Sequence, residues 1–138
     1  MLQVVNDNSD STKAAAAVGA ILRTHSDLAG IACVEAAGGV GAATAVNEAG
    51  KVGKVTIISM DRDDQTLDFV EQGVILASTA QKTALMSYLG TLMLYQYVNH
   101  PVPIVANNVA AAVTPLPSTV DTGALIIDKS NAHFFFHK

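Results

Sequence analysis

Three polar residues follow apolar runs that are predicted to be β-strands, and together they could bind a small polar molecule. Each lies directly after such a run: Glu35 after residues 30–34, Asp61 after 55–60, and Gln81 after 75–80. In an open α/β sheet, ligands bind outside the carboxyl ends of parallel strands. Ionised carboxylates accept hydrogen bonds from hydroxyl groups, and an amide both donates and accepts them. This spacing therefore predicts a hydrogen-bonding site at one edge of a sheet.

The elements that would position these residues alternate between strands and helices. Apolar runs predict the strands, and helical periodicity with capping residues predicts the helices between them. The predicted strands are 2–5, 30–34, 55–60, 75–80 and 123–127, and the predicted helices are 12–25, 40–49, 65–72 and 83–98. Continuous apolar strands alternating with helices are typical of a mostly parallel sheet with helices on both faces. We therefore expect residues 1–138 to form a single α/β domain, a three-layer sandwich.

The composition fits a compact domain and excludes several classes of partner. Half of the 138 residues are hydrophobic and 14% are charged, so the chain is not a solvated disordered segment. The net charge is −4 and no basic run occurs, which leaves no electrostatic footprint for nucleic acid. No signal-peptide pattern is present, and the longest apolar helix, 84–98, is too short to span a membrane. Cys33 lies inside a predicted strand and is expected to be a buried small hydrophobe.

A glycine motif between the second and third predicted strands resembles a dinucleotide-binding fingerprint. Gly39-Val-Gly41 opens a helix, and Asp61 ends the next strand, where such proteins bind ribose. However, Glu35 would place a carboxylate near the phosphates, and Thr44 stands at the position of the third glycine. The favoured interpretation is that the glycines let a helix start close to the sheet. A nucleotide-cofactor domain stays as the alternative, and no cofactor is expected.

The acidic run and the histidines do not indicate catalysis. The run at 61–64 could be a metal site or contain an aspartate that accepts a phosphoryl group, but no lysine stands at the end of a fifth strand to complete the phosphoryl-acceptor site. Asp63 and Asp64 fit the start of a helix, where acidic side chains complement the dipole. His133 and His137 have helical spacing, and no third metal ligand is in view. We expect neither a metal site nor an enzymatic activity.

Five stretches carry a resemblance that covers nearly the whole chain: 25–31, 41–51, 53–61, 73–81 and 120–131. In their order and spacing, they resemble the C-terminal portion of a type I periplasmic sugar-binding protein, one of the ribose-binding-protein-like solute receptors of ABC transporters. The resemblance implies a small sugar or polyol as ligand. It also implies a parent protein that docks on an ABC permease and works in the periplasm or outside the cytoplasm.

The resemblance implies which residues contact the ligand. In that family an Asn or Asp commonly follows the first of the three strands, a Phe-Asp pair ends the second, and a Gln follows the third. Carried over to this sequence, Glu35 takes the first place, Met60 and Asp61 the second, and Gln81 the third. Glu35 is longer than the usual residue, and Met60 replaces an aromatic platform for the sugar ring. The identity of the sugar is therefore left open.

Receptors of this family have two lobes, and the resemblance covers part of one. The N-terminal lobe and the first strand and helix of the C-terminal lobe have no counterpart, and residues 83–119 would contact or belong to the other lobe. We expect a homodimer that covers the apolar side of helix 83–98 and the tail 134–136, with exchange of terminal segments as one route and an interface above about 1,000 Å². The alternatives are rearrangement within one chain and an interaction fragment that binds no ligand.

Overall fold

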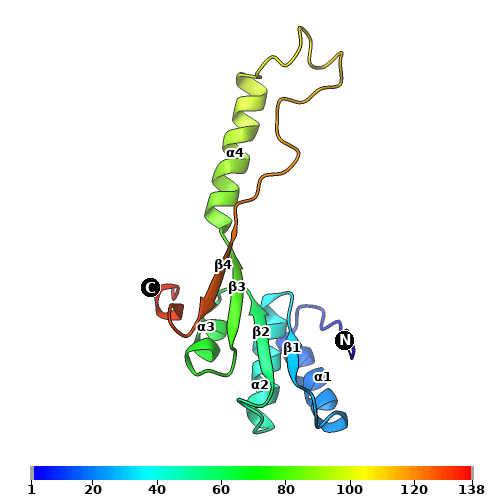
Figure 1. Cartoon of the computed structure of the whole chain (residues 1–138), viewed down its shortest axis with the longest axis vertical. Coiled ribbons are helices and arrows are strands. Elements are labelled where there is room, and N and C mark those ends of the chain that lie inside the picture. The colour runs from blue at the N-terminus through cyan, green and yellow to red at the C-terminus, as the bar shows by residue number, and fades with distance from the viewer. Residues whose placement is uncertain (1, 138) are drawn as a thin grey trace. The chain divides into compact units, whose positions relative to one another are not determined.

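The computed structural model describes residues 2–137 and divides the chain into two compact units (Figure 1). Unit 1 extends to Ala80 and resumes at Leu125, and unit 2 is Gln81–Ala124. The elements in chain order are α1 (Ser11–Thr24), β1 (Gly30–Ala32), α2 (Ala36–Glu48), β2 (Thr56–Met60), α3 (Asp64–Glu71), β3 (Ala77–Gln81), α4 (Thr83–Asn99), β4 (Ala124–Asp128) and the 3-10 helix η1 (Ala132–Phe134).

The strands form one sheet in the order β1-β2-β3-β4. Strands β1 and β2 are parallel with Ile31 opposite Ile57, and β2 and β3 are parallel with Met60 opposite Thr79. The arrow of β4 points opposite to that of β3 (Figure 1). The predicted α/β fold with a mostly parallel sheet is therefore confirmed.

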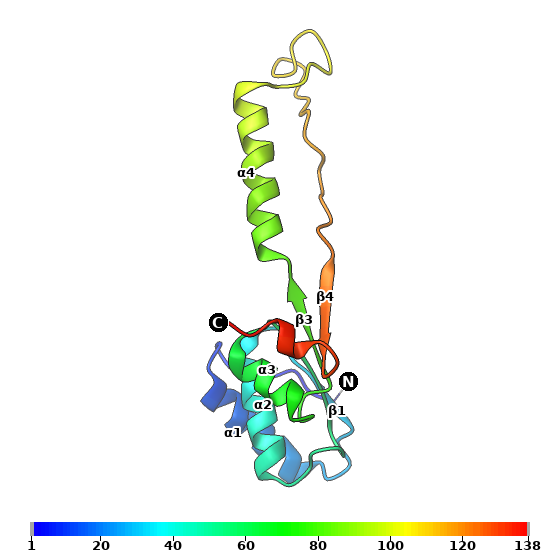
Figure 2. The same cartoon turned by 90° about the vertical axis from the view of Figure 1, so that its left-hand side faces the viewer.

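Helices α1, α2 and α3 all lie on one face of the sheet (Figure 2). Burial along β2 alternates accordingly, because Ile57 and Ser59 are buried under the helices while Thr56 and Ile58 on the other side are exposed. Both crossovers, from β1 to β2 and from β2 to β3, move across the sheet in the same direction. Right-handed crossovers of that kind place their helices on the same face. The described residues thus form two of the three layers expected from the sequence.

The hydrophobic core of unit 1 lies between this helical layer and the sheet. Its largest fully buried apolar side chains are Ile57, Leu67, Ile75, Ile127, Val46 and Val70. The C-terminal tail adds to it, because Phe135 and Phe136 pack against the core while Phe134 is 77% exposed. Most of this tail, which was expected to contribute to a dimer interface, therefore packs against the core of its own chain.

Local capping explains where the helices begin. Asp10 accepts hydrogen bonds from the backbone N–H groups of Thr12 and Lys13 at 2.9 and 3.1 Å, so α1 starts at Ser11, one residue before the predicted start at 12. Helix α2 starts four residues before the predicted position 40, because the side chain of Glu35 caps it. Asp63 caps α3 through the N–H of Thr66 at 2.9 Å. Capping residues thus set these boundaries more accurately than apolar periodicity does.

One predicted strand is absent from the structure, and the other four have bounds that differ from the prediction by one or two residues. Residues 2–5 were expected to form a strand but have no regular structure, and Val4 is 76% exposed. The physical reason is that a strand needs a pairing partner, and within residues 2–137 none pairs with this segment. Strand β3 begins and ends later than the predicted 75–80, so Gln81 is its last residue rather than the residue after it.

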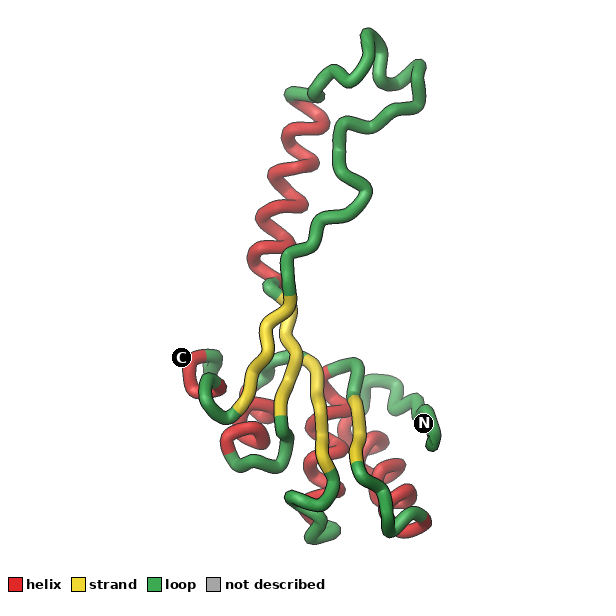
Figure 3. Tube along the Cα trace, viewed as in Figure 1, coloured by secondary structure: helices red, strands yellow, loops and turns green. Residues whose placement is uncertain are grey.

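Unit 2 consists of α4 and the long loop 100–123, which has no helix or strand (Figure 3). None of the residues of α4 is buried. In the loop, the Asn108 side chain accepts hydrogen bonds from the N–H groups of Ile104 and Val105 and donates one to the carbonyl of Val102. Among the described residues, no helix is both long enough and apolar enough to cross a membrane.

Candidate functional site

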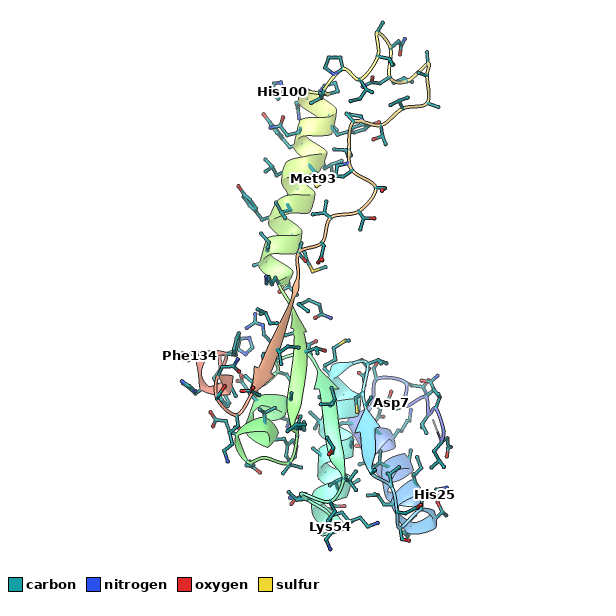
Figure 4. All side chains as sticks on the ribbon, viewed as in Figure 1. Asp7, His25, Lys54, Met93, His100 and Phe134 are labelled. Atoms are coloured by element: carbon teal, nitrogen blue, oxygen red, sulfur yellow. The ribbon has the colours of Figure 1, made fainter. Side chains whose placement is uncertain are left out.

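The parallel strands β1, β2 and β3 end at the same side of the sheet, which we call the carboxyl edge. Glu35 and Asp61 follow the ends of β1 and β2 there. Figure 4 shows Asp7 beside the end of β1, whereas His25 and Lys54 lie at the opposite end of the strands. The carboxyl edge therefore carries several acidic side chains.

Asp61 has the most constrained backbone at this edge. Its φ of 79° lies in the left-handed region, which most residues other than glycine avoid and which aspartate and asparagine adopt more readily than most. Two hydrogen bonds to β3 hold it, since its N–H donates to the Thr79 carbonyl at 2.8 Å and its carbonyl accepts from the Ser78 hydroxyl at 2.5 Å. The side chain is exposed, and one carboxylate oxygen accepts from the Arg62 N–H at 2.9 Å. The fold thus fixes an exposed carboxylate at the end of β2.

Glu35 has a structural role that the sequence did not reveal. Its carboxylate accepts hydrogen bonds from the N–H groups of Ala37, at 3.0 Å, and Gly38, which lie in the first turn of α2. A carboxylate has about four lone-pair sites, so two backbone donors leave acceptor capacity for a ligand hydroxyl. Glu35 is therefore a helix cap that can also face a ligand.

Asp7 is a candidate that the sequence analysis did not include in the site. A Cβ added to Gly38 would lie 2.8 Å from Glu35 Oε1 and 3.0 Å from Asp7 Oδ2, so both carboxylates lie against the same glycine. Asp7 follows segment 2–5, which was predicted to be a strand, just as Asp61 follows β2, and the same rule about strand ends could have identified it.

Cys33 lies beside these two carboxylates and is half-buried. Burial raises the pKa of its thiol to about 11, and the negative charges of Glu35 and Asp7 act in the same direction. The thiol therefore stays protonated at neutral pH and is a poor nucleophile. This agrees with its prediction as a small apolar residue.

Met60 and Gln81 are placed by the ends of their strands. Met60 is the last residue of β2 and is half-buried. Gln81 is the last residue of β3, is exposed, and begins unit 2. Both positions follow from the register of β2 and β3. Met60 is paired with Thr79, and Gln81 lies two residues after Thr79.

The glycine motif of α2 is explained by packing. A Cβ at Gly39 would lie 1.8 Å from the Ser59 hydroxyl oxygen, and one at Gly41 would lie 2.4 Å from the carbonyl oxygen of Ser11. These glycines bring α2 against β2 and against α1, and their open sides are filled by protein atoms. A dinucleotide phosphate would need that space, so the nucleotide-cofactor alternative is not favoured.

Asp63, Asp64 and His137 have local partners. Asp63 caps α3, and the His137 ring lies 2.9 Å from the Asp64 carboxylate. The N–H and ring of His137 hold the pKa of Asp64 below its ordinary value. Across residues 2–137, no group of three or more His, Cys, Asp or Glu side chains is arranged to hold a metal ion.

The chain resembles solved structures of solute-binding proteins. It is 33% identical to a sugar-binding protein of a sugar ABC transporter from Bacillus halodurans, with a TM-score of 0.84 over 98% of this chain and 46% of that one. It is 34% identical to an arabinose-binding protein from Geobacillus stearothermophilus, with a TM-score of 0.85 over 99% of this chain and 46% of that one.

A third structure is more distant. This solute-binding protein from Agrobacterium vitis, bound with α-D-tagatopyranose, is 25% identical with a TM-score of 0.81, over 99% of this chain and 43% of that one. The chain therefore spans less than half the length of each of these relatives. No curated protein shows significant similarity to it.

The sequence profile described as the periplasmic binding protein domain matches residues 1–101. That match covers most of unit 1 and continues through α4. The α/β sheet and the matched relatives agree with this assignment. The chain belongs to the periplasmic binding protein domain family.

Proposed function

We propose that this chain forms part of a solute receptor that binds a small sugar or polyol at the carboxyl edge for an ABC transport system. Glu35, Met60, Asp61 and Gln81 would contact the ligand. The observation that carries the proposal is the backbone of Asp61, which is held in a left-handed conformation by two hydrogen bonds and presents an exposed carboxylate. A backbone outlier that the surrounding structure enforces points to a functional role.

The chemistry of the edge suits hydroxyl groups. The carboxylates of Asp61 and Glu35 accept hydrogen bonds from hydroxyl donors, and charged acceptors form stronger bonds than neutral ones. The Gln81 amide can donate to a ring or hydroxyl oxygen and accept from a neighbouring hydroxyl. The thioether of Met60 is apolar and adaptable, so it can pack against the C–H face of a sugar ring. We add Asp7 to this set, because it lies with Glu35 against Gly38.

The relatives support this choice of ligand class. Their titles name sugar-binding and arabinose-binding proteins, and one is bound with α-D-tagatopyranose. The family consists of binding proteins, and it is extracytoplasmic. We infer that a receptor containing this lobe works outside the cytoplasm and delivers its solute to an ABC permease.

Binding by this chain alone should be weak. The chain spans 46% of the relatives' length, so any ligand contacts made by the rest of a receptor are not available to it. We expect a Kd in the mM range rather than the µM range, a difference of about 4 kcal/mol.

Titration calorimetry with arabinose, tagatose and inositol tests the proposal. Asp61→Asn keeps the size of the side chain and removes its charge, so we expect it to weaken binding of the best ligand at least about tenfold. Asp27→Asn is the matched control, because Asp27 is an exposed residue of the turn before β1 at the other end of the strands. Equal affinity of the wild type and Asp61→Asn would contradict the proposed site. If none of the sugars stabilises the chain against thermal unfolding at about 100 mM, a concentration well above the expected Kd, the result favours a non-binding interaction fragment.

We further propose that the isolated chain forms a homodimer through α4, with exchange of terminal segments as one route. The support is the exposure of its large apolar residues, including Leu94 at 62% and Tyr95 at 54%. An exposed apolar helix of this kind marks an interaction surface. Sedimentation at micromolar concentration should show twice the 14.3 kDa mass of one chain. Leu94→Lys should shift it to the monomer, whereas Val109→Lys in the loop should not, and a wild-type monomer would exclude the dimer.

A further inference from the structure

Ser78 in β3 has a fully buried hydroxyl group. It is paired with Ser59 and lies with it on the side of the sheet that the helices cover. Ala80, which is 2% exposed on the same side, shows that alanine packs well there. A buried hydroxyl costs free energy unless it is hydrogen-bonded. Packing alone therefore does not account for a serine at position 78, and the partner of its hydroxyl group becomes the question.

That partner is the backbone carbonyl of Asp61, which accepts a hydrogen bond from Ser78 Oγ at 2.5 Å. The N–H of Asp61 still bonds to the Thr79 carbonyl at 2.8 Å, in the manner of a parallel ladder. Carbonyl groups of a ladder lie in the plane of the sheet, whereas the side chain of Ser78 stands out of that plane. The carbonyl of Asp61 is therefore turned out of the ladder, in keeping with its φ of 79°.

The peptide unit between Asp61 and Arg62 links the Ser78 hydroxyl to the Asp61 carboxylate. A trans peptide unit is planar, and its carbonyl and N–H groups point in opposite directions. Ser78 bonds to the carbonyl of this unit, and its N–H, which belongs to Arg62, donates to Asp61 Oδ1 at 2.9 Å. Rotation of the unit would carry that N–H away from Oδ1. A hydrogen bond at one end of the peptide unit thus fixes the donor that orients the carboxylate.

We propose that Ser78 is a positioning residue for ligand binding at the carboxyl edge. Its hydroxyl group holds the peptide unit between Asp61 and Arg62, and that unit aims the exposed carboxylate of Asp61 at the ligand. Ser78 is buried and acts only through Asp61. The inference rests on the proposed function, because that function assigns Asp61 to the ligand.

Nuclear magnetic resonance of the full chain without ligand tests whether Ser78 holds the peptide unit. Ser78→Ala removes the donor and keeps Cβ. The amide proton signal of Arg62 should move upfield, and its exchange with solvent should become at least about tenfold faster, because the bond to Asp61 Oδ1 is lost. Ser59→Ala is the matched control, since Ser59 is 1% exposed on the neighbouring strand and its hydroxyl donates to the Met60 carbonyl. The Arg62 amide should be unchanged in this control.

Titration of the same signals with arabinose, tagatose and inositol tests the effect on binding. For the ligand that binds best, Ser78→Ala should weaken affinity at least about tenfold. Ser78→Thr keeps a hydroxyl group on the same Cβ and should restore most of the affinity. Asp61→Gly tolerates the left-handed φ and lacks the carboxylate, so adding Ser78→Ala to it should cause no further loss. A purely structural role would lower affinity equally with and without the carboxylate.

Two results would overturn the proposal. One is an Arg62 amide that is unchanged in Ser78→Ala, and the other is an equal loss of affinity from Ser78→Ala in the wild type and in Asp61→Gly. Circular dichroism verifies the fold of each variant, and Ser78→Cys, whose thiol is a weak donor, replaces Ser78→Ala if the latter does not fold. A wild type that binds none of the three compounds would refute the proposed function, whereas the Arg62 amide decides independently whether Ser78 holds the peptide unit.

Discussion

Helices α2 and α4 are both mostly apolar, and the structure uses them in opposite ways. In α2, seven of the 13 residues are buried, and they include three glycines and three alanines. In α4, none of the 17 residues is buried. The small residues of α2 let it approach α1 and β2 closely, whereas the surface of α4 consists largely of its own large apolar side chains.

The large apolar residues of α4 do not lie on one side. The exposed ones are Leu85, Met86, Tyr88, Leu92, Leu94, Tyr95, Tyr97 and Val98, which at 3.6 residues per turn point in every direction around the helix. From the sequence, we expected a single apolar side on this helix. A helix that is apolar all round is typical of the interior of a larger protein. The comparison shows that unit 1 completes a core from its own residues, whereas unit 2 exposes its large apolar side chains.

Glycine substitutions should show the largest difference between the two helices. Gly41→Ala forces a Cβ to within 2.4 Å of a backbone oxygen of α1, so we expect a loss of about 3 kcal/mol of unfolding free energy. Gly39→Ala should behave similarly against Ser59. In α4, Gly90→Ala meets no atom within 4 Å and should stabilise the helix by up to about 1 kcal/mol. Urea unfolding followed by circular dichroism measures all three, and tolerance of Gly41→Ala would show that α1 and α2 are not packed as described.

Identical valine truncations should show a smaller difference. Val46 in α2 is fully buried, and Val46→Ala should cost about 2 kcal/mol through lost burial and a residual cavity. Val98 in α4 is 66% exposed, and Val98→Ala should change the stability of the monomer by less than about 0.5 kcal/mol. All three tyrosines lie in α4, so tyrosine fluorescence reports on that helix separately. A large cost for Val98→Ala at high protein concentration would instead indicate that α4 is covered in an assembly.

Alkaline pH should act on unit 1 alone, through Cys33. Because the pKa of the thiol is raised from 9.0 to about 11, the folded chain holds this proton more tightly than the unfolded chain does. The resulting stability is fully present below pH 9.0 and is lost as the pH rises to about 11. Cys33→Ala removes the group, so its stability should fall less than that of the wild type over this interval. Parallel pH profiles of the two proteins would refute the effect.

The sequence predicted the alternation of elements well, because each depends on local signals. Capping by Asp10 and the glycine at 73, with a φ of 75°, mark ends of α1 and α3 that require only neighbouring residues. The positions of Glu35 and Asp61 after parallel strands followed from the same patterns. Local chemistry therefore determined the α/β class and the acidic residues expected at the carboxyl edge.

Only the tertiary structure decided which of these residues have further roles. The capping of α2 by Glu35, the proximity of Asp7 and the left-handed backbone of Asp61 all depend on contacts between elements that are distant in sequence or on the exact helix start. Segment 2–5 has a strand-like sequence, yet it forms no strand because pairing needs a neighbour. Apolar periodicity predicts that a surface will be buried, but the tertiary structure determines which element buries it.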